Sequence, residues 1–350
     1  MPVAPKNAML LLGTGAALVA AAVASLALGS VPIAAREVFV ALLGPEQVEP
    51  TVRIIVWIIR MPRTIAATAG GAALALSGLQ MQTLFRNPLA GPFTLGISSG
   101  AGLGVAVVVL ASGAGGVMGA IAEGFGGYGP YALVSAATAG AAMVLAAILF
   151  VARRVANITT VLILGILFGY GANAITTALL QLAEPLQIQS YVTWSFGSFG
   201  GVTWQQLGAF LPVVAVGLLL SAALMKPLNA LLLGERYAAT LGMSLPRSRF
   251  LIIVTTALLA GATTAFCGPI AFIGIAVPHL CRFALRTSDH RLLVPACALA
   301  GALIAVLSDL VSRLPGHEVT LPLNAVTAFI GVPIVVWVIF HRSRMHPGAM

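Results

Sequence analysis

Long apolar stretches, separated by short polar or Gly/Pro-rich segments, follow one another along the whole chain. The hydrocarbon core of a bilayer is about 30 Å thick, so an apolar helix needs roughly 20 residues to cross it, and fewer where a broken helix is packed inside the protein. We therefore expect ten transmembrane helices, at Ala8–Leu28, Thr64–Phe85, Phe93–Ala111, Pro130–Val151, Ile158–Ala183, Leu207–Met225, Phe250–Cys267, Ile270–Leu285, Leu292–Val311 and Leu321–Phe340. The pattern predicts an all-α polytopic membrane protein that forms a single transmembrane domain over residues 1–350.

Composition excludes a water-soluble globule. Hydrophobic residues make up 59% of the chain and charged residues 8%, whereas an ordinary soluble domain carries roughly 25% charged residues. The mean hydropathy is +1.04. The net charge is +9, but no basic run is long enough, or interleaved with aromatic residues, to follow a nucleic-acid backbone. We expect membrane lipid, and no nucleic acid, around this chain.

The distribution of charge gives the orientation. Ten helices place both termini on one side, and Lys and Arg mark the cytoplasmic loops. With the N-terminus inside, thirteen of the 18 Lys and Arg residues are cytoplasmic: Lys6, Arg86, Arg153, Arg154, Lys226, Arg236, Arg247, Arg249, Arg282, Arg286, Arg291, Arg342 and Arg344. The outer segments hold Arg36, Arg53, Arg60, Arg63 and Arg313, with Glu37, Glu46, Glu49, Glu123, Glu184 and Glu318. We expect a multi-pass protein of the cytoplasmic (inner) membrane with both termini inside.

Two Gly/Pro breaks interrupt the helices in equivalent places, each before a short span. The first contains Asn87 and Pro88, and the second contains Gly268, Pro269 and Pro278. Proline ends the preceding helix, and glycine lets the backbone turn closely against its neighbours. Matching breaks in two halves of opposite direction indicate an inverted repeat with a transport path between the halves. The alternative is that the small residues only permit close helix packing.

A polar, glycine-rich region follows the fifth predicted span on the outer side. Its residues Ser190–Trp204 predict a short movable helix at the mouth of a path, or alternatively an aromatic belt at the interface. Behind it, uncharged polar side chains recur at helical spacing and predict one polar helix face. The candidate path residues are Asn173, Thr176, Thr177, Gln181, Ser195 and Ser198.

The longest cytoplasmic loop, at about residues 226–249, carries sequence signals for the start and the end of a further short helix. Glu235 suits a helix start, and Gly242 suits a helix end. A two-turn helix is too short to be stable alone in water. We expect it to lie in a groove of a partner, the alternative being a connector packed on the chain's own helices.

The chain resembles the permease subunits of ATP-binding cassette importers for iron siderophores, haem and cobalamin, the FecCD family. The matching stretches, which together extend over nearly the whole chain, are Arg60–Thr64, Gly70–Gly78, Arg86–Ala90, Leu95–Ala101, Gly234–Glu235, Leu241–Gly242, Gly268–Ile270, Val277–Leu280 and Asp289–Arg291. One departure is Gly91, where many relatives carry an acidic residue.

The resemblance implies a type II importer fold. Two copies of the chain would form a homodimer around a central path, with two cytoplasmic ATPase subunits and an extracytoplasmic substrate-binding protein. ATP and Mg²⁺ would bind at the ATPase subunits, so we expect this chain to carry no cofactor. ATPase coupling would fall to Gly234, Glu235, Arg236, Leu241 and Gly242.

Docking of the binding protein would fall to Arg60, Arg63 and Arg313 by the same resemblance. The residues themselves leave two other interpretations open. Arg60 and Arg63 can extend to the membrane interface, and Arg313 can pair with Asp309 one turn earlier.

The sequence also argues against other kinds of function. A phosphate-binding loop needs a GK[ST] lysine, and the only lysines are Lys6 and Lys226, so we expect no ATPase site on this chain. No readable pattern brings a nucleophile, a base and an orienting group together, so a membrane-embedded enzyme is not expected either. Cys267, Cys281 and Cys297 lie in or beside apolar runs, and with His279 they complete no metal site. An ion-driven secondary transporter is the remaining alternative, with Asp309 and His279 as a sparse proton relay. We expect ATP-driven alternating access and, among metal chelates, favour an iron chelate as cargo.

Overall fold

A computed structural model describes residues 5–29, 31–111, 129–152, 154–155, 157–313 and 320–345. Arg153, Glu123 and Glu318, which contributed to the charge pattern, lie outside the described residues. Within the described residues, every predicted span is helical. The spanning helices are α1 (Pro5–Ala27), α4 (Met61–Leu84), α5 (Ile97–Ala111), α7 (Gly129–Ala152), α8 (Ile158–Leu180), α10 (Trp204–Ala223), α13 (Leu245–Cys267), α14 (Ile273–Leu285), α15 (His290–Ser312) and α16 (Leu323–Met345).

Length and hydropathy separate these helices into two groups. Seven described helices are long and apolar enough to cross a membrane, and α5, α14 and α16 contribute shorter apolar segments. Two of the short helices, α5 and α14, directly follow the predicted breaks. They are packed inside the protein against α7 and α15, respectively, which is where short broken helices are tolerated in a membrane.

The second span differs from the prediction. The structure has one continuous helical segment over Pro50–Leu84, made of α3 (Pro50–Ile54), the π-helical segment η2 (Ile55–Arg60) and α4. The sequence pattern placed its start at Thr64, because Arg60 and Arg63 interrupt the apolar run. Preceding it on the outer side are α2 (Ala35–Leu43) and the 3-10 turn η1 (Pro45–Gln47), neither of which was predicted.

Three further short helices, besides α2, lie outside the spans. The outer helix α9 (Pro185–Ser195) overlaps the glycine-rich region Ser190–Trp204 only at its start and ends before the glycines, and α12 (Glu235–Thr240) falls where the inner loop predicted a helix. The third, α11 (Met225–Leu232), was not predicted as a separate helix. In addition, the 3-10 turn η3 (Pro92–Leu95) leads into α5.

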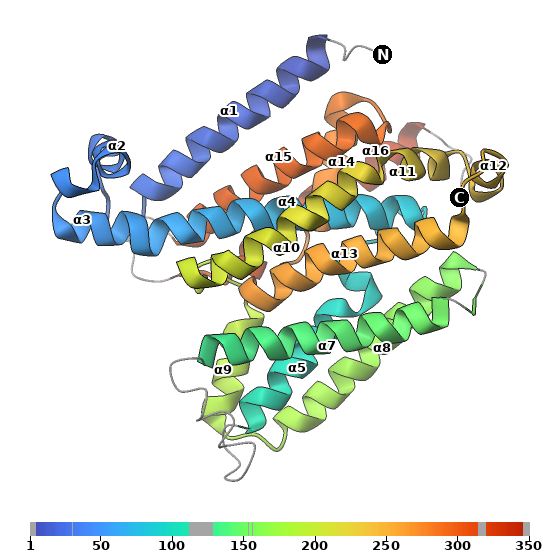
Figure 1. Cartoon of the computed structure of the whole chain (residues 1–350), viewed down its shortest axis with the longest axis horizontal. Helices are drawn as coiled ribbons and strands as arrows, with labels where there is room; N and C mark the ends of the chain where they lie inside the picture. Colours follow the sequence, from blue (N-terminus) through green and yellow to red (C-terminus); the bar gives the residue numbers. More distant parts are fainter. Residues whose placement is uncertain are drawn as a thin grey trace.

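The spans pack side by side in two groups that meet at α13. Figure 1 shows α1, α15 and α4 on one side, α10 and α13 in the middle, and α5, α7 and α8 on the other side. One apolar core surrounds α4, α10, α14 and α15, and a second surrounds α5, α7 and α8. Glycines allow the closest approaches: a Cβ on Gly78 would lie 1.7 Å from the Gly274 carbonyl oxygen, and one on Gly71 would lie 2.3 Å from that of Gly301. Such small-residue contacts are typical of helix packing in membranes.

The helices preceding the two breaks run antiparallel to each other. α4 ends at the inner side, and α13 ends at the outer side, where the chain returns into the membrane as α14 (Figure 1). Both turns contain a glycine in the left-handed region, Gly96 at φ 69° and Gly268 at φ 72°. This is the antiparallel order that an inverted repeat predicts.

Candidate functional site: outer cluster, central helix and inner loop

Three arginines and one aspartate form a cluster at the outer end of the spans. Arg60 ends the π-helical segment, Arg63 lies in the first turn of α4, and Arg313 follows α15. Both oxygens of Asp309 are engaged: Arg63 Nε lies 2.9 Å from Oδ1 and 3.0 Å from Oδ2, and Arg313 Nη2 lies 3.2 Å from Oδ2. Asp309 therefore bridges two cations, and the pairing of Arg313 with Asp309 that the sequence left open is present.

The same cluster holds the C-terminal end of α1. Arg60 Nη1 donates to the carbonyls of Leu26 at 2.7 Å and Ala27 at 2.9 Å, and Arg313 Nη1 donates to those of Ser25 at 3.1 Å and Leu28 at 3.2 Å. The last carbonyls of a helix lack partners within the helix and carry partial negative charge, which cations neutralise. The two arginines therefore fix the end of α1 against α4 and α15.

Burial separates the three predicted docking residues. Arg60 is 5% exposed and Arg313 is 6% exposed, so neither extends to the membrane interface. Burial lowers the pKa of Arg313 from its ordinary value, and the neighbouring Asp309 opposes this shift. The side chain of Arg63 keeps 16% exposure. Of the three, Arg63 is the one that a partner can approach.

A cavity of about 380 Å³ reaches Arg63 and Asp309 from the outer side. Its other walls come from α9, the turn after it and the start of α16, and they include Thr193, Ser198, Thr320 and Leu321. Ser198, a path residue predicted in the outer glycine-rich region, therefore lies beside the arginine cluster. Ser195 is held by its own helix, since its hydroxyl donates to the Val192 carbonyl at 2.7 Å.

The polar residues predicted on one face of the fifth span divide into two sets. Asn173, Thr177 and Gln181 are exposed on or just after α8. Thr176 is not part of that face: it is 4% exposed, and its hydroxyl donates to the Ala172 carbonyl. The four positions span too wide an arc for one exposed face, so the helix turns Thr176 toward its packed side.

The outer break is held by a residue that the sequence interpretation missed. Asn324, at the start of α16, donates from Nδ2 to the carbonyls of Pro269 at 2.7 Å and Ser195 at 3.1 Å. Its Oδ1 accepts from the Ala271 backbone N–H at 2.9 Å. The side chain joins the break after α13 to the end of α9. Beside it, Gly268 has no room for a side chain, because a Cβ would lie 2.5 Å from the Trp194 carbonyl oxygen.

The inner break is held from the other half of the molecule. Asn87 Oδ1 accepts from the Leu89 backbone N–H at 2.9 Å, which closes the turn. His279 Nε2, on α14, donates to the Pro88 carbonyl at 2.7 Å. Pro278 precedes this histidine within α14. The segment that follows the second break thus stabilises the first one.

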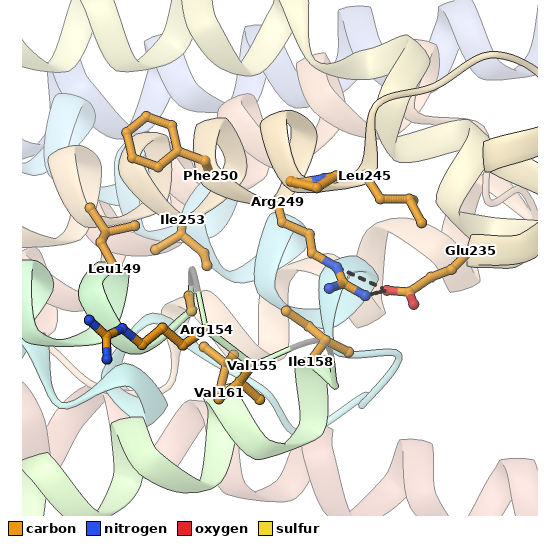
Figure 2. A pocket seen from close by; sticks show the side chains of 12 residues that line it. Leu149, Arg154, Val155, Ile158, Val161, Glu235, Leu245, Arg249, Phe250 and Ile253 are labelled. Atoms are coloured by element: carbon orange, nitrogen blue, oxygen red, sulfur yellow. Dashed lines mark hydrogen bonds and ion pairs between the residues drawn. The ribbon is translucent and has the colours of Figure 1, made fainter.

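The inner loop presents α12 away from the bundle. Gly234 before it and Gly242 after it have φ values of 110° and 82°, which suit glycine. Of the six residues of α12, Ala238 is buried, whereas Arg236 and Tyr237 are exposed, as is Leu241 just after the helix. Glu235 Oε1 lies 2.6 Å from Arg249 Nη2 at the start of α13, which ties α12 to a spanning helix (Figure 2).

A polar network also ties α11 to the bundle. Asn229 Nδ2 donates to Asp289 Oδ1 at 2.6 Å, and Asn229 Oδ1 accepts from His290 Nδ1 at 2.8 Å. His290 Nε2 is in turn hydrogen-bonded to Thr83 Oγ1, at the end of α4. For Asp289, burial raises the pKa, but hydrogen bonds from the Arg291 backbone and Asn229 outweigh it, so the net shift is downward. The motif Asp289–Arg291 was visible in the sequence, and its contact with α11 was not.

The described residues contain no group of three or more His, Cys, Asp or Glu residues that could hold a metal ion. Cys267, Cys281 and Cys297 are free and buried. His279, the nearest candidate ligand in the sequence, is engaged with the Pro88 carbonyl.

Comparisons with known proteins agree with this architecture. The model of the FecCD transport family matches residues 17–341. The vitamin B12 import system permease protein BtuC of Salmonella paratyphi A is 39% identical over 291 residues, which cover 83% of this chain and 85% of the relative. BtuC of Salmonella typhi is 38% identical over the same coverage. A solved inward-facing structure, described as that of a metal-chelate type ABC transporter, superposes with a TM-score of 0.81 at 27% identity, covering 95% of this chain and 98% of that one.

Fold and sites together define a multi-pass, all-helical transport protein of the inner membrane. The chain belongs to the FecCD transport family. It is the transmembrane permease subunit of an ABC importer, and the ATPase is a separate subunit.

Proposed function

We propose that this permease carries a cobalamin-like metal chelate. The observation that carries the proposal is the identity of 39% over 83% of the chain with permeases named for vitamin B12 import. The iron chelate favoured from the sequence becomes the second candidate. Cobalamin and iron chelates are both large, so the width and polarity of the path matter more than any single charged group.

The path is proposed to form between two copies of the chain. α8 leaves a long face uncovered in the single chain, with Tyr170 68% exposed and Ile175 54% exposed beside Asn173 and Thr177. Apolar contact between two such faces would support a dimer, and the uncharged polar groups would give a large solute weak, non-specific contacts. This supports a homodimer with the fifth spans at its centre.

Docking of an extracytoplasmic binding protein is proposed to depend on Arg63. Its guanidinium lies at the outer cavity, and an incoming carboxylate can form a charge-assisted hydrogen bond there. Arg60 and Arg313 support the docking surface indirectly, because they hold the end of α1 in place. Their contribution is therefore to position the outer face.

Coupling to two cytoplasmic ATPase subunits is proposed to depend on α12. Its exposed residues Arg236, Tyr237 and Leu241 give a partner groove both charge and apolar surface. The Glu235–Arg249 ion pair then carries a displacement of α12 into α13. ATP and Mg²⁺ would act at those subunits, and the resulting motion would alternate access between the outer cavity and the cytoplasm.

The test begins with the assembly. The tagged chain is extracted in mild detergent from its native membrane, and the proteins that co-purify are identified by mass spectrometry with their stoichiometry. We expect an ATPase of the ABC class at equal stoichiometry. The chain emerging alone from a membrane that contains that ATPase would instead favour ion-gradient-driven transport through Asp309 and His279.

Substrate is then assigned with the purified complex in proteoliposomes, with ATP inside and the binding protein outside. We expect ATP-dependent accumulation of labelled cobalamin above that of a ferric siderophore or haem. Accumulation of the ferric siderophore without cobalamin would overturn the proposed cargo and leave the importer class intact.

A further inference from the structure

An open cavity of about 640 Å³ lies between α13 and the segment that joins α7 to α8 (Figure 2). Its walls are mainly apolar, with Leu149, Val155 and Ile158 on one side and Leu245, Phe250 and Ile253 on the other. Three charged side chains also line it, Arg154, Arg249 and Glu235. None of the residues assigned above to the transport path or to the outer cavity lines this space.

The cavity lies on a side of the molecule that is suited to lipid. α7, α10 and α13 lie next to one another in Figure 1, and each exposes large apolar side chains. Phe150 on α7 is 61% exposed, Leu219 on α10 is 71% exposed and Phe250 on α13 is 39% exposed. Helices that span a bilayer present such surfaces to acyl chains. The apolar walls of the cavity continue this surface at the inner end of α7 and α13.

The charges at the cavity favour an anion. Two guanidinium groups and one carboxylate line the cavity: Arg249 pairs with Glu235, and the Arg154 guanidinium points away from that pair (Figure 2). The lining therefore carries one more positive than negative group. Arg154 is exposed, and its guanidinium lies 4.9 Å from the centre of the Phe150 ring, a position typical of an arginine at the inner interface. Basic residues at the cytoplasmic surface attract anionic lipid head groups.

We propose that this cavity binds one anionic phospholipid of the inner leaflet in each protomer. An acyl chain would lie against Leu149 and Phe250, and the phosphate would lie at Arg154. A phospholipid fits because it joins an apolar chain to an anionic group, as the cavity joins apolar walls to an exposed arginine. The inference does not depend on the substrate proposed above.

Native mass spectrometry of the purified permease tests the site. Phosphatidylglycerol and phosphatidylcholine with identical acyl chains are added at equal concentration, and retained lipid is counted per protomer. Each basic residue near the surface contributes about 1 kcal/mol toward an anionic lipid, so we expect phosphatidylglycerol to be retained at least about fivefold better. Arg154→Gln should remove most of that preference.

Two further variants separate the parts of the site. Leu149→Trp fills the apolar part from a partly buried position and leaves both arginines, so it should lower retention of both lipids. Arg291→Gln removes an exposed cytoplasmic arginine outside the cavity and serves as the matched control, with no expected change. Equal retention of the two lipids by the wild type, or unchanged preference in Arg154→Gln, would overturn the proposal. Displacement of phosphatidylglycerol by inorganic phosphate would also overturn it, because the site would then bind a free anion.

Discussion

The outer arginine cluster and the inner Glu235–Arg249 pair use the same ionic chemistry in opposite ways. At the outer end, Asp309 is 1% exposed and bridges Arg63 and Arg313, and backbone carbonyls of α1 take further hydrogen bonds from Arg60 and Arg313. At the inner end, the side chain of Glu235 keeps 33% exposure, and the pair joins a short helix to the start of α13.

This difference bears on which parts of an importer are fixed and which move. A buried ion network with every partner engaged has few alternative arrangements, and removing one member leaves an uncompensated charge. An exposed ion pair contributes little to stability and can break at low cost. We therefore assign the outer cluster to holding the docking face rigid, and the inner pair to a contact that changes as the partner ATPases move.

The largest effect is expected from Asp309→Ala. It removes the carboxylate that Arg63 and Arg313 share and leaves two cations together in a mostly buried site. Breaking a buried ion pair in this way typically costs about 3–5 kcal/mol of stability. Thermal and chemical unfolding of the purified permease in one detergent would measure the loss.

The control for this variant is Glu37→Ala, which removes an exposed acid from α2 on the same outer side. It should change stability by less than about 0.5 kcal/mol. If Asp309→Ala and Glu37→Ala unfolded alike, the rigidity assigned to the outer cluster would be wrong.

Arg63→Gln should act on docking more than on folding. Asp309 keeps Arg313 as a partner in this variant, whereas Arg63→Glu would set two carboxylates against each other. Hydrogen bonds to charged groups contribute about 1.5–3 kcal/mol, so binding-protein affinity should fall about tenfold or more at low salt. Surface-immobilised permease titrated with the binding protein gives this value.

Salt provides the internal control for that measurement. Screening weakens exposed charge pairs as ionic strength rises, so the wild type and Arg63→Gln should converge at high salt. An affinity that is the same in both proteins at low salt would remove Arg63 from the docking role.

Asn324→Ala should produce a smaller, local effect at the outer break. The variant leaves the Pro269 and Ser195 carbonyls and the Ala271 N–H without their side-chain partner. An unsatisfied buried polar group costs about 1–3 kcal/mol. Hydrogen exchange of the outer break should increase while that of the inner break does not. The inner counterpart Asn87→Ala, which removes the acceptor of the Leu89 N–H, should show the reverse pattern. Uniform exchange changes in both variants would contradict separate roles for the two asparagines.

The spans could be predicted from sequence because each one is an apolar run long enough to cross a bilayer. The start of the second span could not, because Arg60 and Arg63 look like a boundary until their partners are known. The end of α1 accepts the hydrogen bonds of Arg60, and Asp309 accepts those of Arg63. Likewise Thr176 has the right spacing for the path, but its burial depends on the helices packed around α8. Hydrophobic periodicity identifies the faces of a helix, and the neighbouring helices determine which residues of each face are buried.

The role of Asn324 was even harder to predict from the sequence. Asn324 reaches partners 55 and 129 residues earlier in the chain, and no local pattern distinguishes it from a solvent-exposed asparagine.

The position of α12 was predictable, because Glu235 and Gly242 are local signals for helix ends. Its attachment to Arg249 was not, because that contact depends on how the loop returns to the membrane.

Glu235→Gln should have the smallest effect on stability and a clear effect on coupling. The pair is partly exposed, so its loss should cost less than about 1 kcal/mol in unfolding. If the pair transmits motion from α12 to α13, substrate uptake per ATP hydrolysed should fall at least about fivefold, the lower range of coupling energies between sites. Proteoliposomes containing the whole complex allow both rates to be measured together.

The reversed pair, Glu235→Arg with Arg249→Glu, should restore part of the coupling, because it rebuilds the attraction with the charges exchanged. Full coupling in Glu235→Gln would show that α12 acts on the spans through α11 and its Asn229 network instead.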